Sequence, residues 1–333
     1  MPVSKLSGKK ILIVRFSSIG DVVTTSTIVR CVKQQSPGCE VHFVTKQEYE
    51  PLIAHNPFIA KFFYLRGSLS SLVSELKAEK YDLVIDLHHN LRTFRLKQAL
   101  GAKSVSFPKL NIEKWLLVNL HLDRMPRVHI VDRYMQILKP FEIVNDGAGL
   151  DFFIPPAEEV NLETMKLEPG RYISFAIGGK YVTKKLPAMK IAAVCSRIKM
   201  PVVLLGGPED RDTGNWIVKN AGDHVQNACG KLLILQSASV VKQSKRLITH
   251  DTGLMHIGAA LKKEVISVWG NTVPLFGMYP YYGDQKIKSI QFEVEGLKCR
   301  PCSKLGYEAC PRGHFRCMND IDNRALEAAA NAD

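Results

Sequence analysis

The sequence lacks most of the patterns that mark membrane-spanning, secreted and common nucleotide-binding proteins. Its 333 residues contain no apolar run near the roughly 18 to 20 residues that cross a bilayer. The loop after the first apolar segment lacks G-x-G-x-x-G, and G-x-x-x-x-G-K-S/T occurs nowhere, which disfavours dehydrogenases and P-loop enzymes. The N-terminal segment has a short apolar run and no cleavage pattern, so we expect no signal peptide and a cytoplasmic location.

Acidic residues are also in deficit, with 32 Asp and Glu against 45 Lys and Arg, which gives a net charge of +13. This charge favours an anionic partner, which can be nucleic acid, a membrane surface or an acidic substrate. The basic residues are scattered, and zinc-finger, RNP and basic-zipper patterns are missing. An anionic substrate or a lipid surface therefore fits better than nucleic acid.

The chain is long enough for two domains, and its strand and helix patterns alternate in both halves. In the first half, strands are expected at 10–16, 41–45 and 83–87, with possible short strands at 62–65 and 104–107, and helices at 22–35 and 70–80 and near Arg95, Trp115 and Tyr134. A stretch rich in Asp, Gly, Pro and Glu at 145–170 predicts the boundary. The second half restarts with strands at 172–176, 202–205 and near Val225, helices from Pro187 and Asp210, and a terminal helix at 320–330. This rhythm predicts α/β domains with parallel sheets.

The most informative stretch is Leu247–Gly270, which reads as strand, loop, helix and strand. Asp251 or Thr252 is a suitable N-cap, and Gly253 allows a ligand close to the backbone, so an anion can meet free N–H groups and the positive end of the helix. His256 lies one turn after Thr252 and faces the same helix end. The alternative is an ordinary capped turn with a half-buried histidine.

Polar residues follow three other expected strands, where parallel sheets bind ligands. Asp21 is either a first-turn acid stabilised by the helix dipole or a general base. The loop after Ala176 contains Gly178 and lysines that can hold phosphate, although such lysines are often only solvated. Glu209, in LGGPED, can accept ribose hydroxyls or help to cap a helix.

In the order of the chain, SSIGD, the K-x-L-P element at Lys184, LGGPED and HDTGLMHIGAAL followed by VISVWG resemble the ADP-heptose:lipopolysaccharide heptosyltransferases, glycosyltransferase family 9. The resemblance implies the GT-B fold, with two facing Rossmann-like doubly wound domains and an interdomain cleft. It places the acceptor on residues 1–155 and the ADP-sugar donor on residues 156–333. The terminal helix is then expected to cross back to the first domain. The implied reaction is an inverting, metal-independent heptose transfer to the Kdo-containing inner core of lipopolysaccharide.

The resemblance also suggests roles for individual residues. Asp21 would be the base, and Lys184 would stabilise the diphosphate, although Lys185 can exchange roles with it because Leu186 replaces a residue that is often aromatic in the family. The donor site would be completed by Gly178, Glu209, Asp251, Thr252, Gly253 and His256.

An N-L-R element similar to one in the family assigns Asn90 and Arg92 to an acidic acceptor, since Arg suits carboxylate and phosphate. The preceding pair, His88 and His89, is a weak metal candidate because adjacent strand residues point apart. The expected partners are thus a nucleotide-sugar donor and a lipid-linked anionic glycan, with peripheral contact at the inner face of the cytoplasmic membrane and no nucleic acid.

No cofactor is required by this interpretation, but the cysteines leave a structural metal open. Four cysteines are dispersed and resemble ordinary buried thiols. Cys299, Cys302, Cys310 and Cys317 form C-x2-C-x7-C-x6-C around His314, which suits structural zinc, disulfides or free thiols. Two functional alternatives also remain: the same reaction with another nucleotide sugar or glycan, and a non-catalytic anion-binding protein on an inherited fold.

Overall fold

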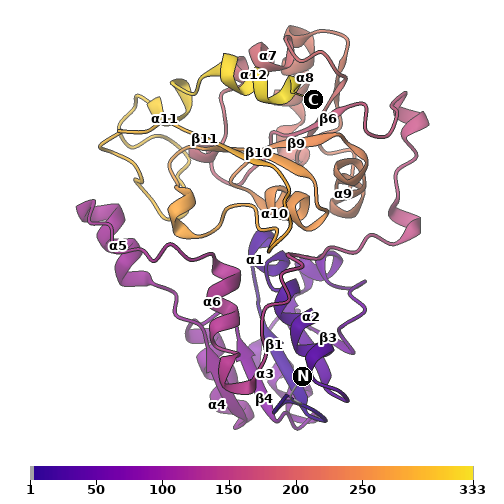
Figure 1. The fold of residues 1–333 in the computed structure, drawn as a ribbon, viewed down its shortest axis with the longest axis vertical. Helices are drawn as coiled ribbons and strands as arrows, with labels where there is room; N and C mark the ends of the chain where they lie inside the picture. Colours follow the sequence, from indigo (N-terminus) through magenta and orange to yellow (C-terminus); the bar gives the residue numbers. More distant parts are fainter. Residues whose placement is uncertain (1–3, 333) are drawn as a thin grey trace. The chain divides into compact units, whose positions relative to one another are not determined.

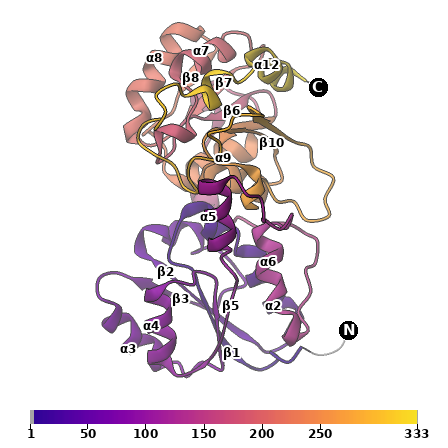
Figure 2. The same ribbon diagram turned by 90° about the vertical axis from the view of Figure 1, so that its left-hand side faces the viewer.

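The computed structural model describes residues 4–332, which form two compact units (Figures 1 and 2). The first unit contains residues up to Lys109, Val128–Phe153 and Tyr281–Gln285. The second contains Leu110–Arg127, Ile154–Pro280 and the residues from Lys286 onward. Two short segments, Leu110–Arg127 and Tyr281–Gln285, are thus grouped with the opposite half of the chain, which a single boundary after residue 155 does not describe.

The first unit is built on a five-stranded parallel sheet in the order β3-β2-β1-β4-β5. Its strands are β1 (Lys10–Val14), β2 (Glu40–Lys46), β3 (Lys61–Leu65), β4 (Leu83–Asp86) and β5 (Lys103–Ser106). Leu12 and Val14 pack with the helices on one face, and the alternation of a strand turns Ile11 and Ile13 to the other. Burial on both faces explains why the central strands read as continuous apolar runs.

Helices cover both faces of this sheet. They are α1 (Ile19–Val23), α2 (Ser26–Gln35), α3 (Leu69–Lys77), α4 (Leu91–Leu100) and α6 (Ile130–Gln136). One helix was expected over residues 22–35, and this was wrong. Thr24 and Thr25 interrupt it because their hydroxyls donate to the carbonyls of Asp21 and Val22, three residues back, in place of regular helical continuation.

The second unit has a six-stranded parallel sheet in the order β11-β10-β9-β6-β7-β8. Its strands are β6 (Ile173–Ala176), β7 (Val202–Leu205), β8 (Val225–Asn227), β9 (Arg246–His250), β10 (Glu264–Trp269) and β11 (Ser289–Glu293). Its helices are α5 (Asn111–Leu120), α7 (Ala188–Cys195), α8 (Arg211–Ala221), α9 (Ile234–Gln243), α10 (Gly253–Ala260), α11 (Arg316–Asn319) and α12 (Asn323–Asn331). The parallel α/β fold expected from the sequence is thereby confirmed.

The terminal helix α12 belongs to the second unit and packs against α7 (Figure 1). Leu326 and Ala330 are fully buried in the core that Ile191 and Val194 of α7 also join. The expectation that this helix returns to the first domain was therefore wrong, since its apolar face is already covered. Three elements, α9, α11 and β11, were not expected from the sequence. Among the described residues, no helix is long and apolar enough to cross a membrane.

Arg30 connects helix α2 to residues 146–151, near the end of the first unit. Its guanidinium donates to both carboxylate oxygens of Asp146, at 2.7 and 2.8 Å, and to the Gly149 carbonyl at 2.8 Å. It also pairs with Asp151. The Arg30 side chain is only 6% exposed, so these contacts hold a charge that is almost fully removed from water.

We expect Arg30→Met to lower the free energy of unfolding by about 3 kcal/mol, because an almost fully buried cation and its bonds to two partly buried carboxylates are lost. Lys5→Met is the matched control, since Lys5 pairs with Glu142 at the surface and its loss should cost below about 1 kcal/mol. Urea denaturation followed by circular dichroism measures both. Equal effects of the two substitutions would contradict the structural role of Arg30.

Candidate active site

Asp21 lies in the loop-to-helix turn that follows β1, at the carboxyl end of the strand. Its Oδ2 accepts bonds from the Ser18 backbone N–H at 3.1 Å and the Ser18 hydroxyl at 2.8 Å, and its Oδ1 pairs with Arg15. Burial raises the pKa of Asp21, but the Arg15 charge and the Ser18 bonds outweigh it and lower the pKa to about 2. The carboxylate is therefore ionised at neutral pH and held in one orientation.

Arg15, which orients Asp21, is itself held by three separate segments of the first unit. It donates to the Ser17 carbonyl at 2.8 Å, to the Tyr134 hydroxyl at 3.1 Å and to the Leu87 carbonyl that follows β4. Sequence reasoning gave Arg15 no role. The available signal was a charged residue at the end of a buried apolar strand, where an arginine needs a partner.

Beside this turn, a cavity of about 680 Å³ opens at the carboxyl ends of the first sheet. The polar side chains that line it are Ser17, Lys46, His88, Asn90, Arg92 and Arg95. The structure thus brings Asn90 and Arg92 to one cavity and adds two cations, Lys46 and Arg95, to which the sequence analysis gave no functional role. Asn90 also caps α4, since its Oδ1 accepts from the Thr93 N–H at 3.0 Å. The Arg92 guanidinium lies 5.9 Å from the centre of the Phe16 ring.

The adjacent histidines point to different partners, as their neighbouring positions suggest. His88 packs edge-on against Phe16, with 5.6 Å between ring centres, whereas His89 Nδ1 lies 2.7 Å from the Phe107 carbonyl. Burial and the charges of Arg15 and Lys109 lower the pKa of His88 to about 4, so it is neutral at pH 7. Its neutral ring leaves the cavity's positive charge to Lys46, Arg92 and Arg95.

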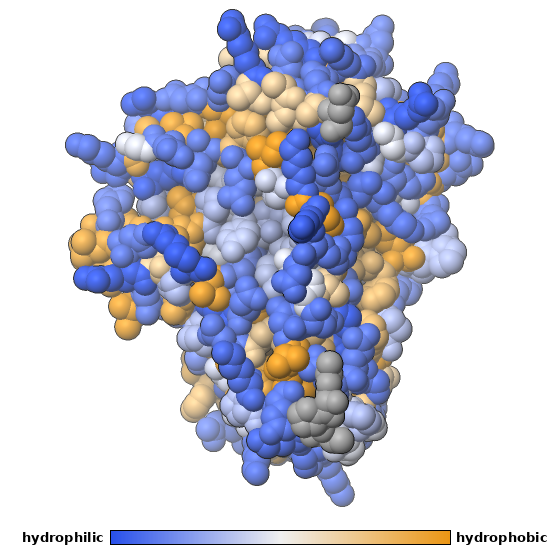
Figure 3. All heavy atoms as spheres, in the orientation of Figure 1, coloured by the Kyte–Doolittle hydropathy of each residue, from blue (hydrophilic) through white to orange (hydrophobic). Residues whose placement is uncertain are grey.

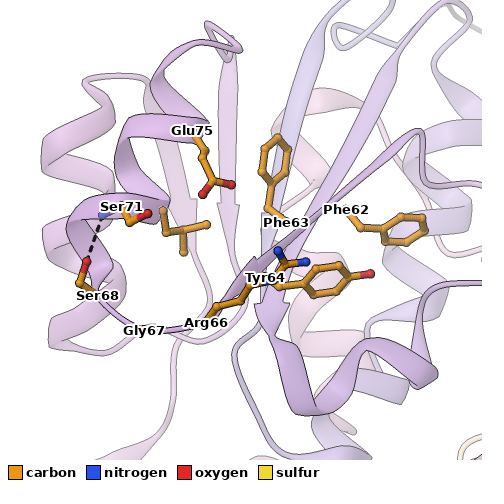
Figure 4. Close-up of a pocket in the computed structure, with 9 residues that line it drawn as sticks. Phe62, Phe63, Tyr64, Arg66, Gly67, Ser68, Ser71 and Glu75 are labelled. Carbon is orange, nitrogen blue, oxygen red and sulfur yellow. Dashed lines mark hydrogen bonds between the residues drawn. The ribbon is translucent and has the colours of Figure 1, made fainter.

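A second cavity, of about 380 Å³, lies between the edge strand β3 and helix α3 (Figure 4). Glu75 and Phe63 face this space, and Ser68 caps α3 by accepting from the Ser71 N–H at 3.2 Å. Arg66 lies at its rim. One cation and one anion without a further cluster of polar groups give this cavity no evident chemistry.

In the described part of the chain, metal-binding side-chain atoms come together at Glu40, His42 and Glu79. Glu79 bonds to Lys10 at 3.0 Å and pairs with Lys61, and these lysines lower the pKa of Glu79 to about 2. The Glu79 carboxylate is thus already paired with two ammonium groups. The arrangement is an ion-pair network and fits a metal cation poorly.

In the second unit, the loop after β9 is held by an ion pair. Lys184 ends a 3₁₀ turn at Val182–Lys184, and its Nζ lies 2.6 Å from Asp251 Oδ2 and 3.2 Å from the Asp251 carbonyl. The Thr272 hydroxyl donates to the same Oδ2 at 2.7 Å. Asp251 therefore binds side chains on neighbouring loops, and the capping position passes to Thr252.

Thr252 is the N-cap of α10, with extended backbone, but its hydroxyl makes no capping hydrogen bond among the described residues. It lies 3.4 Å from the Thr249 hydroxyl instead. The first turn of α10, beginning at the half-buried Gly253, thus presents N–H groups that no side chain caps. His256 is on the same helix and is 2% exposed, so its side chain is buried in the second unit.

The other donor-site candidates also lie at carboxyl ends of strands. Gly178 follows β6, and a Cβ there would lie 2.5 Å from Asp210 Oδ2, so no other residue fits without movement. Asp210 accepts from Lys185 Nζ at 3.2 Å and from the Gly207 N–H at 3.0 Å. Glu209 is exposed beside them. Lys184 and Lys185, interchangeable by sequence, therefore have different anionic partners.

The cysteine-rich tail contains free thiols in this structure. Cys299 Sγ lies 3.7 Å from His314 Nε2. Burial, together with the neighbouring thiols, raises the pKa of Cys302 and raises that of Cys317 to about 12, which opposes thiolate formation. The donor set is one that zinc accepts, but in the described residues these atoms do not form a closed group around one point.

Comparison with known proteins matches the family model described as glycosyltransferase family 9 (heptosyltransferase) over residues 69–306. A lipooligosaccharide heptosyltransferase 2 from Haemophilus influenzae is 22% identical, over 93% of this chain and 95% of its own. A family 9 glycosyltransferase from Veillonella parvula superposes with a TM-score of 0.78 at 22% identity, covering 98% and 97% of the two chains. An Escherichia coli ADP-heptose LPS heptosyltransferase II gives 0.68 at 19% identity, covering 97% and 100%.

The likeness to the solved structures establishes the GT-B fold for this pair of parallel α/β domains. The family match extends from α3 to the cysteine-rich tail and so includes Lys184, Asp251 and Thr252. By this match the chain is a glycosyltransferase, and it belongs to glycosyltransferase family 9, the heptosyltransferases.

Proposed function

We propose that this enzyme transfers a heptose from ADP-heptose to the inner core of lipopolysaccharide, with inversion at the anomeric carbon and without a metal ion. The observation that carries the proposal is the ionised Asp21 carboxylate, fixed at the end of β1 by Arg15 and Ser18. An inverting transfer needs one base on the acceptor side. The names of the Haemophilus and Escherichia relatives, both heptosyltransferases, support heptose as the sugar.

In the proposed reaction, an acceptor hydroxyl attacks the anomeric carbon opposite the diphosphate. The bond from that carbon to the phosphate oxygen breaks, and ADP leaves with the electron pair. The hydroxyl proton passes to Asp21, whose Oδ1 retains a lone pair beside the Arg15 contact. Although a carboxylate with a pKa near 2 is a weak base, the hydroxyl becomes strongly acidic as its oxygen bonds to carbon, so transfer is favourable late in the step.

The second unit would bind the donor. The uncapped first turn of α10, from Thr252 and Gly253, offers N–H groups to the diphosphate, and Lys184 supplies the positive charge. Gly178 leaves room for the nucleotide beside Asp210, and Glu209 can accept ribose hydroxyls. Asp251 and His256 would position this loop. The Lys184 ammonium and these N–H groups would supply the positive charge that the leaving diphosphate needs, so the proposed reaction uses no metal ion.

The first unit would bind the acceptor. The cavity with Asn90, Arg92, Lys46 and Arg95 suits the carboxylates and phosphates of a lipid-linked inner-core glycan. Such an acceptor would bring the enzyme to the inner face of the cytoplasmic membrane as a peripheral protein. The +13 net charge supports approach to that anionic surface.

Asp21→Asn should lower kcat by roughly 10²-fold or more, because the amide cannot accept the proton. The ADP-induced rise in thermal midpoint should stay unchanged, since Asp21 lies outside the donor unit. Glu142→Gln, which removes an exposed carboxylate of the same unit, is the control and should keep full turnover. A near-normal kcat for Asp21→Asn would remove this residue from catalysis.

The pH profile should depend on Arg15. In the wild-type enzyme Asp21 stays ionised far below neutrality, because its pKa is lowered to about 2. Arg15→Met removes the lowering charge and leaves burial, which raises the pKa, so the acid limb of kcat/KM should move to higher pH. Arg15→Lys keeps the charge and should move it less. An unchanged acid limb in Arg15→Met would show that Asp21 is not the titrating group.

Lys184→Ala should weaken ADP binding by roughly tenfold, in line with the loss of a charge-assisted contact to phosphate. Lys185→Ala is the matched variant and should change it little, since Lys185 pairs with Asp210. Thermal shifts with ADP, UDP and GDP report both effects by mass action. A larger loss in Lys185→Ala would transfer the role to that residue, and stabilisation by UDP or GDP alone would exclude an ADP-heptose donor.

A further inference from the structure

Helix α5 exposes three large apolar side chains, more than any other helix of the described residues. Ile112 is 73% exposed, Trp115 is 56% exposed, and Leu120 is 51% exposed. These positions are three, five and eight residues apart, and the half-buried Leu116 lies between them on the same face. Leu122, just beyond the helix, is 51% exposed and extends the patch.

The opposite face of α5 is fixed to its own unit. Leu117 and Met125 are buried in a small apolar cluster with Val273 and Phe276. The helix also ends abruptly, because its C-cap His121 adopts a left-handed backbone conformation. The exposed face is therefore presented by an element that is anchored on one side, and its exposure does not follow from a frayed segment.

Basic residues outnumber acidic ones in the segment that holds these apolar side chains. The segment 109–127 carries Lys109, Lys114, Arg124 and Arg127. It has two acidic residues, Glu113 and Asp123, and Asp123 pairs with Arg127 at 2.6 Å. Figure 3 shows the result over α5, where strongly apolar and strongly polar side chains lie next to each other on the surface. A basic surface with an aromatic residue and aliphatic residues is typical of proteins that lie in a membrane interface.

We propose that the face formed by Ile112, Trp115, Leu120 and Leu122 inserts into the headgroup region of an anionic lipid bilayer. Trp and aliphatic side chains gain from leaving water, and the neighbouring Arg and Lys groups contact lipid phosphates. Met189 and Leu233 stand singly and need no partner, and α4 exposes only the pair Leu91 and Phe94. A second copy of the chain is a poorer occupant, since the net positive segments 109–127 of the two copies would repel each other.

This docking deepens the proposed function, because a lipid-linked acceptor requires an enzyme at the membrane, but it can be measured without donor or acceptor. In a Trp216→Phe background, Trp115 is the exposed indole, while Trp269 is fully buried. Vesicles of phosphatidylglycerol and phosphatidylcholine with brominated acyl chains should quench its emission, and phosphatidylcholine alone should quench it much less. Added salt should weaken the binding.

Ile112→Ser with Trp115→Ser should lower the vesicle partition coefficient by roughly tenfold or more, because two interfacial side chains are lost. Trp216→Ala, which removes the exposed Trp of α8, is the matched control and should leave partitioning unchanged. The ADP-induced thermal shift of the double variant should remain that of wild type, which shows that the second unit is folded. With the acceptor in vesicles its KM should rise, and with a water-soluble deacylated acceptor it should not.

Unquenched Trp115 or unchanged partitioning of the double variant would overturn the proposal. A wild-type dimer in sedimentation that dissociates in the double variant would also overturn it and would assign this face to a second copy. Vesicle binding with no activity on ADP-heptose would leave the docking face in place and reject the proposed function, so the two failures are distinguishable.

Discussion

Both sheets of this protein are parallel and covered by helices on their two faces, and this burial decides where chemistry can occur. A buried strand has no position for a solvated polar side chain, so charged groups collect where the strands end. Asp21 follows β1, Arg92 lies beyond β4, Gly178 follows β6, and Asp251 follows β9. The carboxyl ends of parallel strands meet at one edge of the sheet. Residues that are far apart in the chain therefore become neighbours within each unit.

Three carboxylates at these edges are held in ion pairs. Arg15 holds Asp21, Lys184 holds Asp251, and Lys185 holds Asp210. Each pair lowers the cost of keeping a charge partly out of water. The pairs differ in their further contacts. The Arg15 guanidinium also donates to two carbonyls and a hydroxyl, whereas both described contacts of the Lys184 ammonium are to Asp251. In the proposed reaction the more firmly held pair would orient the base, and Lys184 would turn from Asp251 toward the diphosphate.

The sequence predicted the parallel α/β fold because buried strands are apolar runs and helices have caps and amphipathic spacing. β7 was predicted at its observed bounds, and the edge strand β3 within one residue. Long-range packing was not visible: nothing local shows that Arg15 reaches Tyr134, that α12 stays on α7, or that α5 is exposed. β11 was missed because a half-exposed edge strand has no continuous apolar run. Local patterns located the loops of the candidate site, and tertiary contacts distinguished Lys184 from Lys185.

Arg246, the first residue of β9, links this strand to the C-terminal helix α12. Its guanidinium is 2% exposed, donates to the Ala329 carbonyl at 2.6 Å and pairs with Glu264 at 3.2 Å. Glu264 supplies the counter-charge, and the last turn of α12 accepts a hydrogen bond from the same guanidinium, at one end of a strand whose other end leads into His250, Asp251 and Thr252. A protease cut or fusion junction that frays α12 would remove a hydrogen-bond acceptor from this buried guanidinium and leave it with Glu264. The C-terminal helix thus supports the start of the strand that leads to the proposed donor site, and affinity tags belong on a flexible spacer beyond it.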